Sequence, residues 1–119
     1  MSLPEIGTNT CIVVGSVTRA PEVRTLGDGR TVTSLELRTA GPAGRREVVP
    51  VAVEGSSAAA GLAPDTPVVV VGRVRQRFFR AGGATQSRTE VVADALVPAR
   101  QRARAARAVA TARRALEPG

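Results

Sequence analysis

Hydrophobic and polar residues follow a β-strand pattern along five stretches of the chain. The most pronounced stretch, residues 68–79, reads VVVVGRVRQRFF. Its run of valines is typical of a strand buried on both sides, and after Gly72 it passes into strict alternation. Because successive side chains of a strand point to opposite faces, the odd positions after Gly72 share one face. These positions are Arg73, Arg75, Arg77 and Phe79. Phe78 is expected on the opposite, buried face.

This arginine row has two interpretations. Guanidinium groups beside an aromatic ring suit a phosphate backbone with exposed bases. The same row could instead be a solvated strand end whose charges protect a sheet edge from aggregation.

Four further stretches have strand patterns: residues 9–19, 30–39, 47–54 and 88–97. The first is expected to bend at Gly15, as barrel strands do. In the third, Val49, Val51 and Val53 are expected to face the core, and Pro50 predicts an edge or a bulge because it lacks an N–H.

The connections complete the prediction of an all-β fold. Residues 20–29 are predicted as a loop that ends in an Asp28-Gly29 turn, and RAGGATQS, residues 80–87, as a hairpin loop. Residues 56–62, SSAAAGL, begin with a good N-cap and predict one short α-helix. Five strands with a short helix between the third and fourth favour a small barrel over a sandwich.

Charge separates the chain into an expected barrel domain, residues 1–97, and a basic tail, residues 98–119. The net charge is +7, and all 17 basic residues are arginine. The barrel holds 11 arginines against 9 acidic residues, a net of +2, and the tail holds 6 arginines against Glu117, a net of +5. The tail has high helix propensity, and the alternative is a solvated or disordered segment. Its helical apolar stripe would be Ala99, Ala103, Ala106, Ala110 and Leu116.

Composition excludes several chemistries. Without His or Lys the chain has no Ser–His–Asp triad, Schiff base or P-loop lysine. One cysteine builds neither a zinc site nor an internal disulfide, and Cys11 is expected to be a buried, inert thiol. Glu90 and Asp94 are expected to pair with nearby arginines rather than with a metal. We therefore expect no enzyme, no cofactor, no metal and no small-molecule substrate.

The N-terminus and the hydropathy bear on location. MSLPEIGTNT lacks the regions of a signal peptide, and no apolar run approaches the length of a membrane span. A cytoplasmic protein without a membrane partner is expected.

Several strings, in this order, resemble the bacterial single-stranded DNA-binding protein family: GTNTCIVVG, APEVRTLGDG, SLELRT, VVVVGRVRQRFF and TEVVADAL. The resemblance covers about residues 7–97. It implies an oligonucleotide-binding (OB) fold, a homo-oligomer, usually a tetramer, and binding of single-stranded DNA without sequence preference. It also implies a nucleoid-associated protein of DNA replication, recombination or repair.

The resemblance carries over to individual positions. Phe79 stands where the family has a base-stacking Trp, Arg75 and Arg77 at basic positions before it, and Arg24 in the PEVR string. The other candidate DNA-binding residues are Arg38, Arg46, Arg73 and Arg80.

The chain also departs from the family pattern, as a divergent paralogue would. Val48 stands where the family usually has a stacking Trp, and Glu54 where it usually has Phe. By parity these two share the outward face of their strand, which reduces the stacking platform to one aromatic. The tail also lacks the family's acidic, partner-recruiting tip.

Two functions stay open at this point. The chain either binds single-stranded DNA mainly by electrostatics, or it is an OB-fold assembly module that has lost most strand binding. RNA stays open as a ligand within the first function, since one phenyl ring does not read the sugar.

Overall fold

The computed structural model describes residues 7–55 and 58–117. Its elements are β1 (Cys11–Val17), β2 (Glu22–Thr25), β3 (Thr31–Ala40), η1 (Pro42–Gly44), β4 (Arg46–Glu54), η2 (Ala58–Gly61), β5 (Pro67–Ala81), β6 (Ala84–Pro98) and α1 (Arg102–Leu116).

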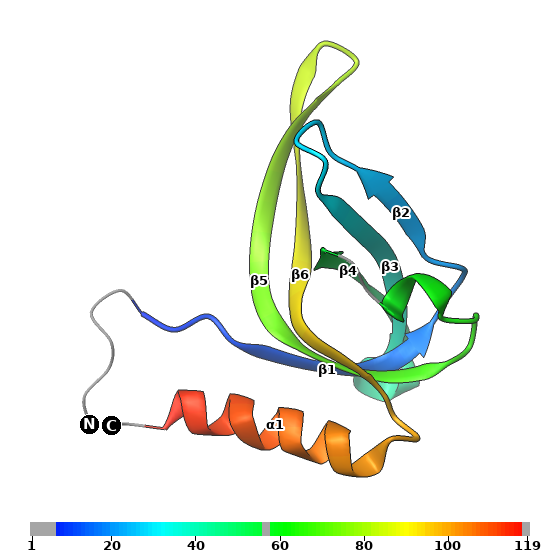
Figure 1. Cartoon of the computed structure of the whole chain (residues 1–119), viewed down its shortest axis with the longest axis vertical. Helices are drawn as coiled ribbons and strands as arrows, with labels where there is room; N and C mark the ends of the chain where they lie inside the picture. Colours follow the sequence, from blue (N-terminus) through cyan, green and yellow to red (C-terminus); the bar gives the residue numbers. More distant parts are fainter. Residues whose placement is uncertain (1–6, 56–57, 118–119) are drawn as a thin grey trace.

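Five strands close a barrel (Figure 1). They pair in the order β1, β5, β6, β4, β3, and β1 returns to pair with β3. All of these pairs are antiparallel except β4 with β6, which is parallel and rests on Val51 and Ala52. The all-β, five-stranded barrel predicted from the pattern is confirmed.

A sixth strand, β2, pairs with β3 outside the barrel order. The prediction that residues 20–29 form only a loop is therefore wrong, although the Asp28-Gly29 turn is present: Gly29 has φ +88° and its N–H donates to the carbonyl of Leu26. All four residues of β2 are exposed. Because its stability comes from the ladder to β3 and not from burial, β2 leaves no hydrophobic pattern in the sequence.

Gly15 is the point where β1 passes from one neighbour to the other. β1 pairs with β5 up to Ser16 and with β3 at Ser16 and Val17. A Cβ atom on Gly15 would lie 2.7 Å from the carbonyl oxygen of Arg38. The expected bend is present, and the close approach of two backbones explains why it holds a glycine.

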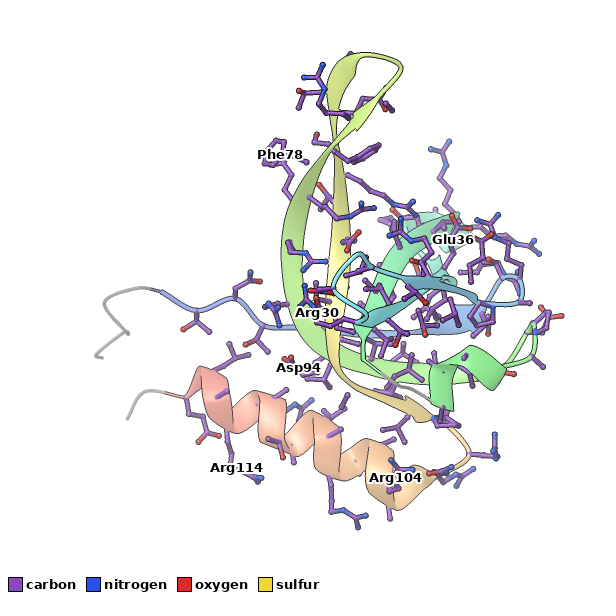
Figure 2. All side chains as sticks on the ribbon, turned by 45° about the horizontal axis from the view of Figure 1, so that its top comes forward. Arg30, Glu36, Phe78, Asp94, Arg104 and Arg114 are labelled. Atoms are coloured by element: carbon purple, nitrogen blue, oxygen red, sulfur yellow. The ribbon has the colours of Figure 1, made fainter. Side chains whose placement is uncertain are left out.

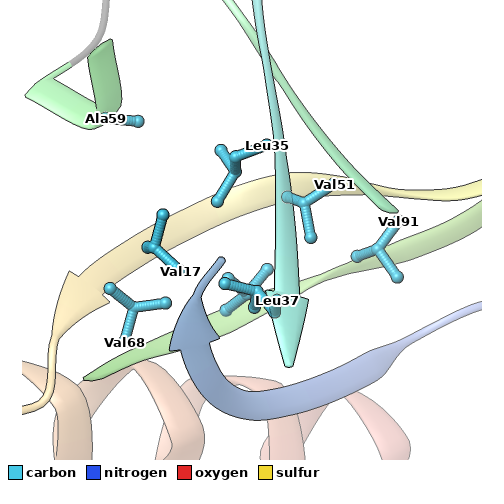
Figure 3. Close-up of a cluster of buried hydrophobic side chains, with 8 residues drawn as sticks. Val17, Leu35, Leu37, Val51, Ala59, Val68 and Val91 are labelled. Atoms are coloured by element: carbon cyan, nitrogen blue, oxygen red, sulfur yellow. The ribbon is translucent and has the colours of Figure 1, made fainter. Parts of the chain in front are cut away.

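The barrel interior is a cluster of aliphatic side chains (Figure 3): Val17, Leu35, Leu37, Val51, Ala59, Val68, Val70 and Val91. Val49, Val53 and Cys11 pack against this cluster, which confirms the predicted inward face of β4. Burial raises the pKa of the half-buried Cys11 thiol. Pro50 precedes the short pairing of β4 with β6, while the register of β4 with β3 is unbroken. Pro50 therefore lies where β4 is an edge strand, and the alternative of a bulge is not observed.

β5 and β6 extend beyond the barrel as a two-stranded arm (Figure 1). The strands are joined at Gly82 and Gly83, both with positive φ. Most of the predicted loop RAGGATQS is thus strand, because polar residues on an exposed arm pair through their backbones without a hydrophobic face. At the barrel end of the arm the register shifts, and Asp94 is left without a Cα partner. There a Cβ on Gly72 would overlap the carbonyl oxygen of Val92.

The two predicted helical segments differ. The described part of residues 56–62 is a single 3-10 turn rather than an α-helix; Ser56 and its predicted capping role lie outside the described residues. The tail forms α1, so the disordered alternative is wrong for residues 102–116. No helix of the described residues has the length and apolarity needed to span a membrane.

Helix α1 packs on the outside of its own barrel. Ala105 packs against Val69 and Val97 together with Ala108 and Val109, and Ala112 is buried as well. This i, i+3, i+4, i+7 face differs from the predicted stripe, of which Ala103, Ala106 and Leu116 are exposed. In an alanine-rich helix two stripes are equally regular. The valine at position 109 marks the one that docks.

Candidate nucleic-acid interface

A hollow of about 420 Å³ lies on the outer face of the barrel, between the β2–β3 hairpin and the base of the arm. Val32, Ser34 and Ala52 form part of its lining. The charged side chains of its lining are Arg24, Glu54, Arg75, Arg77 and Glu90. A second hollow, of about 190 Å³, shares Arg24, Ser34 and Arg77 and adds Arg19, Arg88 and two glutamates. Because the two hollows share three lining residues, we call them together the outer groove.

Strand register explains how the arginines reach this groove. Across β5 and β6, Arg75 is opposite Glu90 and Arg77 is opposite Arg88. Residues directly opposite on antiparallel strands point to the same face. The predicted alternation of the arginine row is therefore present. Arg88 was missed, because its position opposite Arg77 is evident only once the turn at Gly82-Gly83 fixes the register.

Glu90 is the anchor of the row. Its side chain is only 6% exposed and accepts hydrogen bonds from Arg75 Nη2 at 2.8 Å and Arg77 Nε at 3.2 Å. Burial alone raises the pKa of the Glu90 carboxyl, but the two guanidinium groups outweigh burial and hold the pKa below its ordinary value of 4.5. Glu90 is thus ionised at neutral pH and fixes the direction of both arginines.

Two further carboxylates face the row. Glu54 lies 3.9 Å from Arg73 and 3.8 Å from Arg75, and Asp94 lies 3.4 Å from Arg73. The expectation that Glu90 and Asp94 pair with arginines is confirmed. The row therefore holds three arginines against three carboxylates. It is a balanced network and not a surplus of positive charge.

The two phenylalanines lie on opposite faces of the arm. The Arg77 guanidinium lies 5.2 Å from the centroid of the Phe79 ring, a cation–π arrangement on the side of the row. Phe78 is 66% exposed and projects from the other side (Figure 2). The prediction that Phe78 is buried is wrong. Alternation places it correctly, but a two-stranded arm has no interior for its second face.

The remaining candidate residues divide between groove and periphery. Arg24 on β2 lines both hollows, whereas Arg38 is paired with Asp65 at 3.0 Å. Arg46 is exposed at the start of β4, and Arg80 donates to the carbonyl of Gly83 within the arm's turn. The structure thus brings together Arg24, Arg75, Arg77 and Arg88, with Arg73 adjoining, and leaves Arg38, Arg46 and Arg80 outside the hollows.

The C-terminal tail carries six arginines, five of them on helix α1. Those of the tail are Arg100, Arg102, Arg104, Arg107, Arg113 and Arg114, all exposed; Figure 2 labels two of them. Within residues 7–55 and 58–117, no ion pair to an acidic residue involves any of the six. A hollow of about 560 Å³ at the start of α1 is lined by Arg100, Arg104, Asp94 and Glu54.

The described part of the chain does not bring three His, Cys, Asp or Glu side chains together as a metal site. The groove is suited to binding anions, because the guanidinium groups of Arg75 and Arg77 are already oriented and about one third exposed.

Comparison with known proteins agrees with this geometry. Among curated proteins no match is found. The model of the Single-strand binding protein family, however, matches residues 8–98, which include the whole barrel, the arm and the outer groove. The chain therefore belongs to the Single-strand binding protein family.

Proposed function

We propose that this chain binds single-stranded DNA without sequence preference, with the strand seated in the outer groove. The observation that carries the proposal is the convergence of Arg24, Arg75 and Arg77 on one hollow, next to the Phe79 ring, within the range matched by the family. A groove that offers guanidinium groups and one ring face binds backbone and base without reading base edges. The biological setting we propose is DNA replication, recombination or repair.

The charge distribution supports a binding mode that is mainly electrostatic. The barrel row is balanced by carboxylates, so the free positive charge of the described chain is concentrated on α1. Counterion release from a strand that contacts these arginines makes affinity fall with salt. A fluorescence-anisotropy titration with labelled oligo-dT at several salt concentrations tests the proposal. Oligo-U in parallel tests whether RNA binds equally, as a platform that does not contact the sugar predicts.

Phe79→Ala is expected to weaken oligo-dT binding about tenfold, whereas Phe78→Ala is expected to change it less than twofold. The physical reason is loss of a stacking surface, for which single-strand-binding proteins themselves give about 1–3 kcal/mol per base. Phe78 is the matched control, because it is the same residue one position away on the solvent side of the arm. Its removal should also leave the thermal midpoint nearly unchanged. A larger loss of binding from Phe78→Ala would place the strand on the other face of the arm.

The second candidate function is an OB-fold assembly module that has lost strand binding. It is favoured by the balanced arginine row, which leaves little net charge in the groove. Absence of oligo-dT binding at low salt, with an intact oligomer, would select it.

We also propose that the chain forms a homo-oligomer, most simply the tetramer usual in the family. β1 pairs with β3 only at Ser16 and Val17. Residues 11–15, which come before them, have β5 as their only neighbour among the described strands and so present an open edge. Val14 on this edge is 61% exposed. The outward face of β5 gives no comparable support, because α1 of the same chain covers Val69.

Light scattering at micromolar concentration is expected to give four times the chain mass of 12.3 kDa. Val14→Lys should lower that mass, since a charge at an open edge opposes pairing with another strand. Val23→Lys is the control, because Val23 is also exposed but lies on β2. A monomeric mass for the unaltered chain would reject the proposal.

A further inference from the structure

We infer that Glu54 is an internal competitor for the phosphate groups of the bound strand, and that it lowers the affinity and the salt dependence of binding. This inference rests on the proposed function and assigns a role to one residue of the same groove.

The contacts of Glu54 differ from those of Glu90, although both carboxylates face Arg75. Glu90 is 6% exposed and hydrogen-bonded at 2.8 Å, so it is a fixed part of the fold. Glu54 is 43% exposed, and its oxygens stay 3.9 Å from Arg73 and 3.8 Å from Arg75. These two contacts are ion pairs without a hydrogen bond. Exposed pairs of this kind are weak, so an incoming phosphate, which can accept two N–H bonds from one guanidinium, can replace them.

Glu54 also stands where the hollows meet. It lines the outer groove, the hollow at the start of α1, and a third hollow beside the β2–β3 turn. A strand that runs from Arg24 and Arg77 toward Arg100 and Arg104 must cross this position. Glu54 is the last residue of β4 and is paired with Val32, so the backbone keeps its carboxylate close to that path. Even after the arginines have turned to phosphate, the carboxylate repels the strand at close range.

The test compares Glu54→Gln with Glu47→Gln in oligo-dT titrations across salt concentrations. Both substitutions remove one negative charge from an exposed residue of β4, but Glu47 lies near the other end of the strand and outside the hollows named above. Glu54→Gln is expected to bind about fivefold to tenfold more tightly at low salt. The plot of log affinity against log salt should steepen by about 0.7 to 1.4, as one or two more phosphate contacts form. Glu47→Gln should change affinity less than twofold and leave the slope unaltered.

Each outcome bears on a specific claim. If the unaltered chain binds oligo-dT and Glu54→Gln, with an unchanged thermal midpoint, binds equally or more weakly, the competitor role is wrong and the proposed function stands. An equal gain in both variants reduces the effect to net charge and also overturns the inference. If neither the unaltered chain nor Glu54→Gln binds, the proposed function fails and the inference fails with it. Binding by Glu54→Gln alone would support the inference in its strongest form.

Discussion

Glu90→Gln is expected to lower the free energy of unfolding at pH 7 by about 3 kcal/mol. The carboxylate is buried and accepts hydrogen bonds from both Arg75 and Arg77. Removing one partner of a buried ion pair costs about 3–5 kcal/mol, and the lower value applies here because both guanidinium groups are about one third exposed and stay partly hydrated. Urea denaturation followed by circular dichroism measures the difference.

The stability contributed by the Glu90 carboxylate should depend on pH in a defined direction. The pKa of Glu90 is lowered in the folded chain, so its contribution is fully present above the ordinary value of 4.5 and is lost as the pH falls through the folded pKa. The difference between the unaltered chain and Glu90→Gln should therefore be large at pH 7 and shrink toward zero in acid. Asp94→Asn is the control, because Asp94 pairs with the same arginine row but is well exposed; about 0.5 kcal/mol or less is expected. Equal stabilities of the Glu90 and Asp94 variants at pH 7 would contradict the anchoring role.

The alternation of residues correctly predicts which side chains of a strand are buried wherever one face of that strand lines the barrel interior. The alternation of Val49, Val51 and Val53, and the bend at Gly15, appear in the structure as the pattern predicts. The same rule fails for Phe78, because the arm beyond the barrel has two solvated faces. It fails for β2, because ladder hydrogen bonds leave no trace in hydropathy. It is ambiguous for α1, because alanine fits several stripes.

The local sequence pattern predicts the arginines of the candidate site but not the carboxylates that pair with them. Parity of β5 places Arg73, Arg75 and Arg77 on one face, and this needs no knowledge of the fold. The carboxylates opposite them come from β4 and β6, up to about twenty residues away in sequence. Whether Glu54 meets Arg73 depends on the parallel pairing of two residues, Val51 and Ala52, with β6. The contact between Glu54 and Arg73 therefore forms only when the barrel closes. An interpretation of each strand by itself treats the three arginines as unpaired positive charge.

Because the barrel arginines are paired with carboxylates, the arginines of the tail should contribute most of the attraction to DNA. In the barrel, Arg73, Arg75 and Arg77 are held by carboxylates, and Arg38 is held by Asp65. On α1 the buried face consists of alanines and Val109, so the arginines are left on the exposed faces. The structure also shows that deletion of residues 99–119 is a poor test of their role. Such a deletion would uncover Val69 and Val97 and alter folding and binding together.

A variant in which the six tail arginines are replaced by Gln is therefore the sharper experiment, with a Lys version as control. The residues are Arg100, Arg102, Arg104, Arg107, Arg113 and Arg114. Gln keeps helix propensity and leaves Ala105, Val109 and Ala112 to dock as before. If about three of the six arginines reach phosphates, the salt slope should become shallower by about 2, and affinity at about 0.1 M salt should fall about a hundredfold.

The Lys version separates charge from geometry. It keeps the net charge and should retain most of the affinity and nearly the whole slope, since counterion release depends on charge and not on the guanidinium fork. Light scattering on both versions shows whether the oligomer is intact. If the Gln version keeps its affinity and slope while its mass falls, the helix serves assembly and the electrostatic account of α1 is wrong. If affinity falls equally in the Gln and Lys versions, bidentate arginine contacts rather than charge carry the binding, and the slope of the Lys version should then change far less than its affinity.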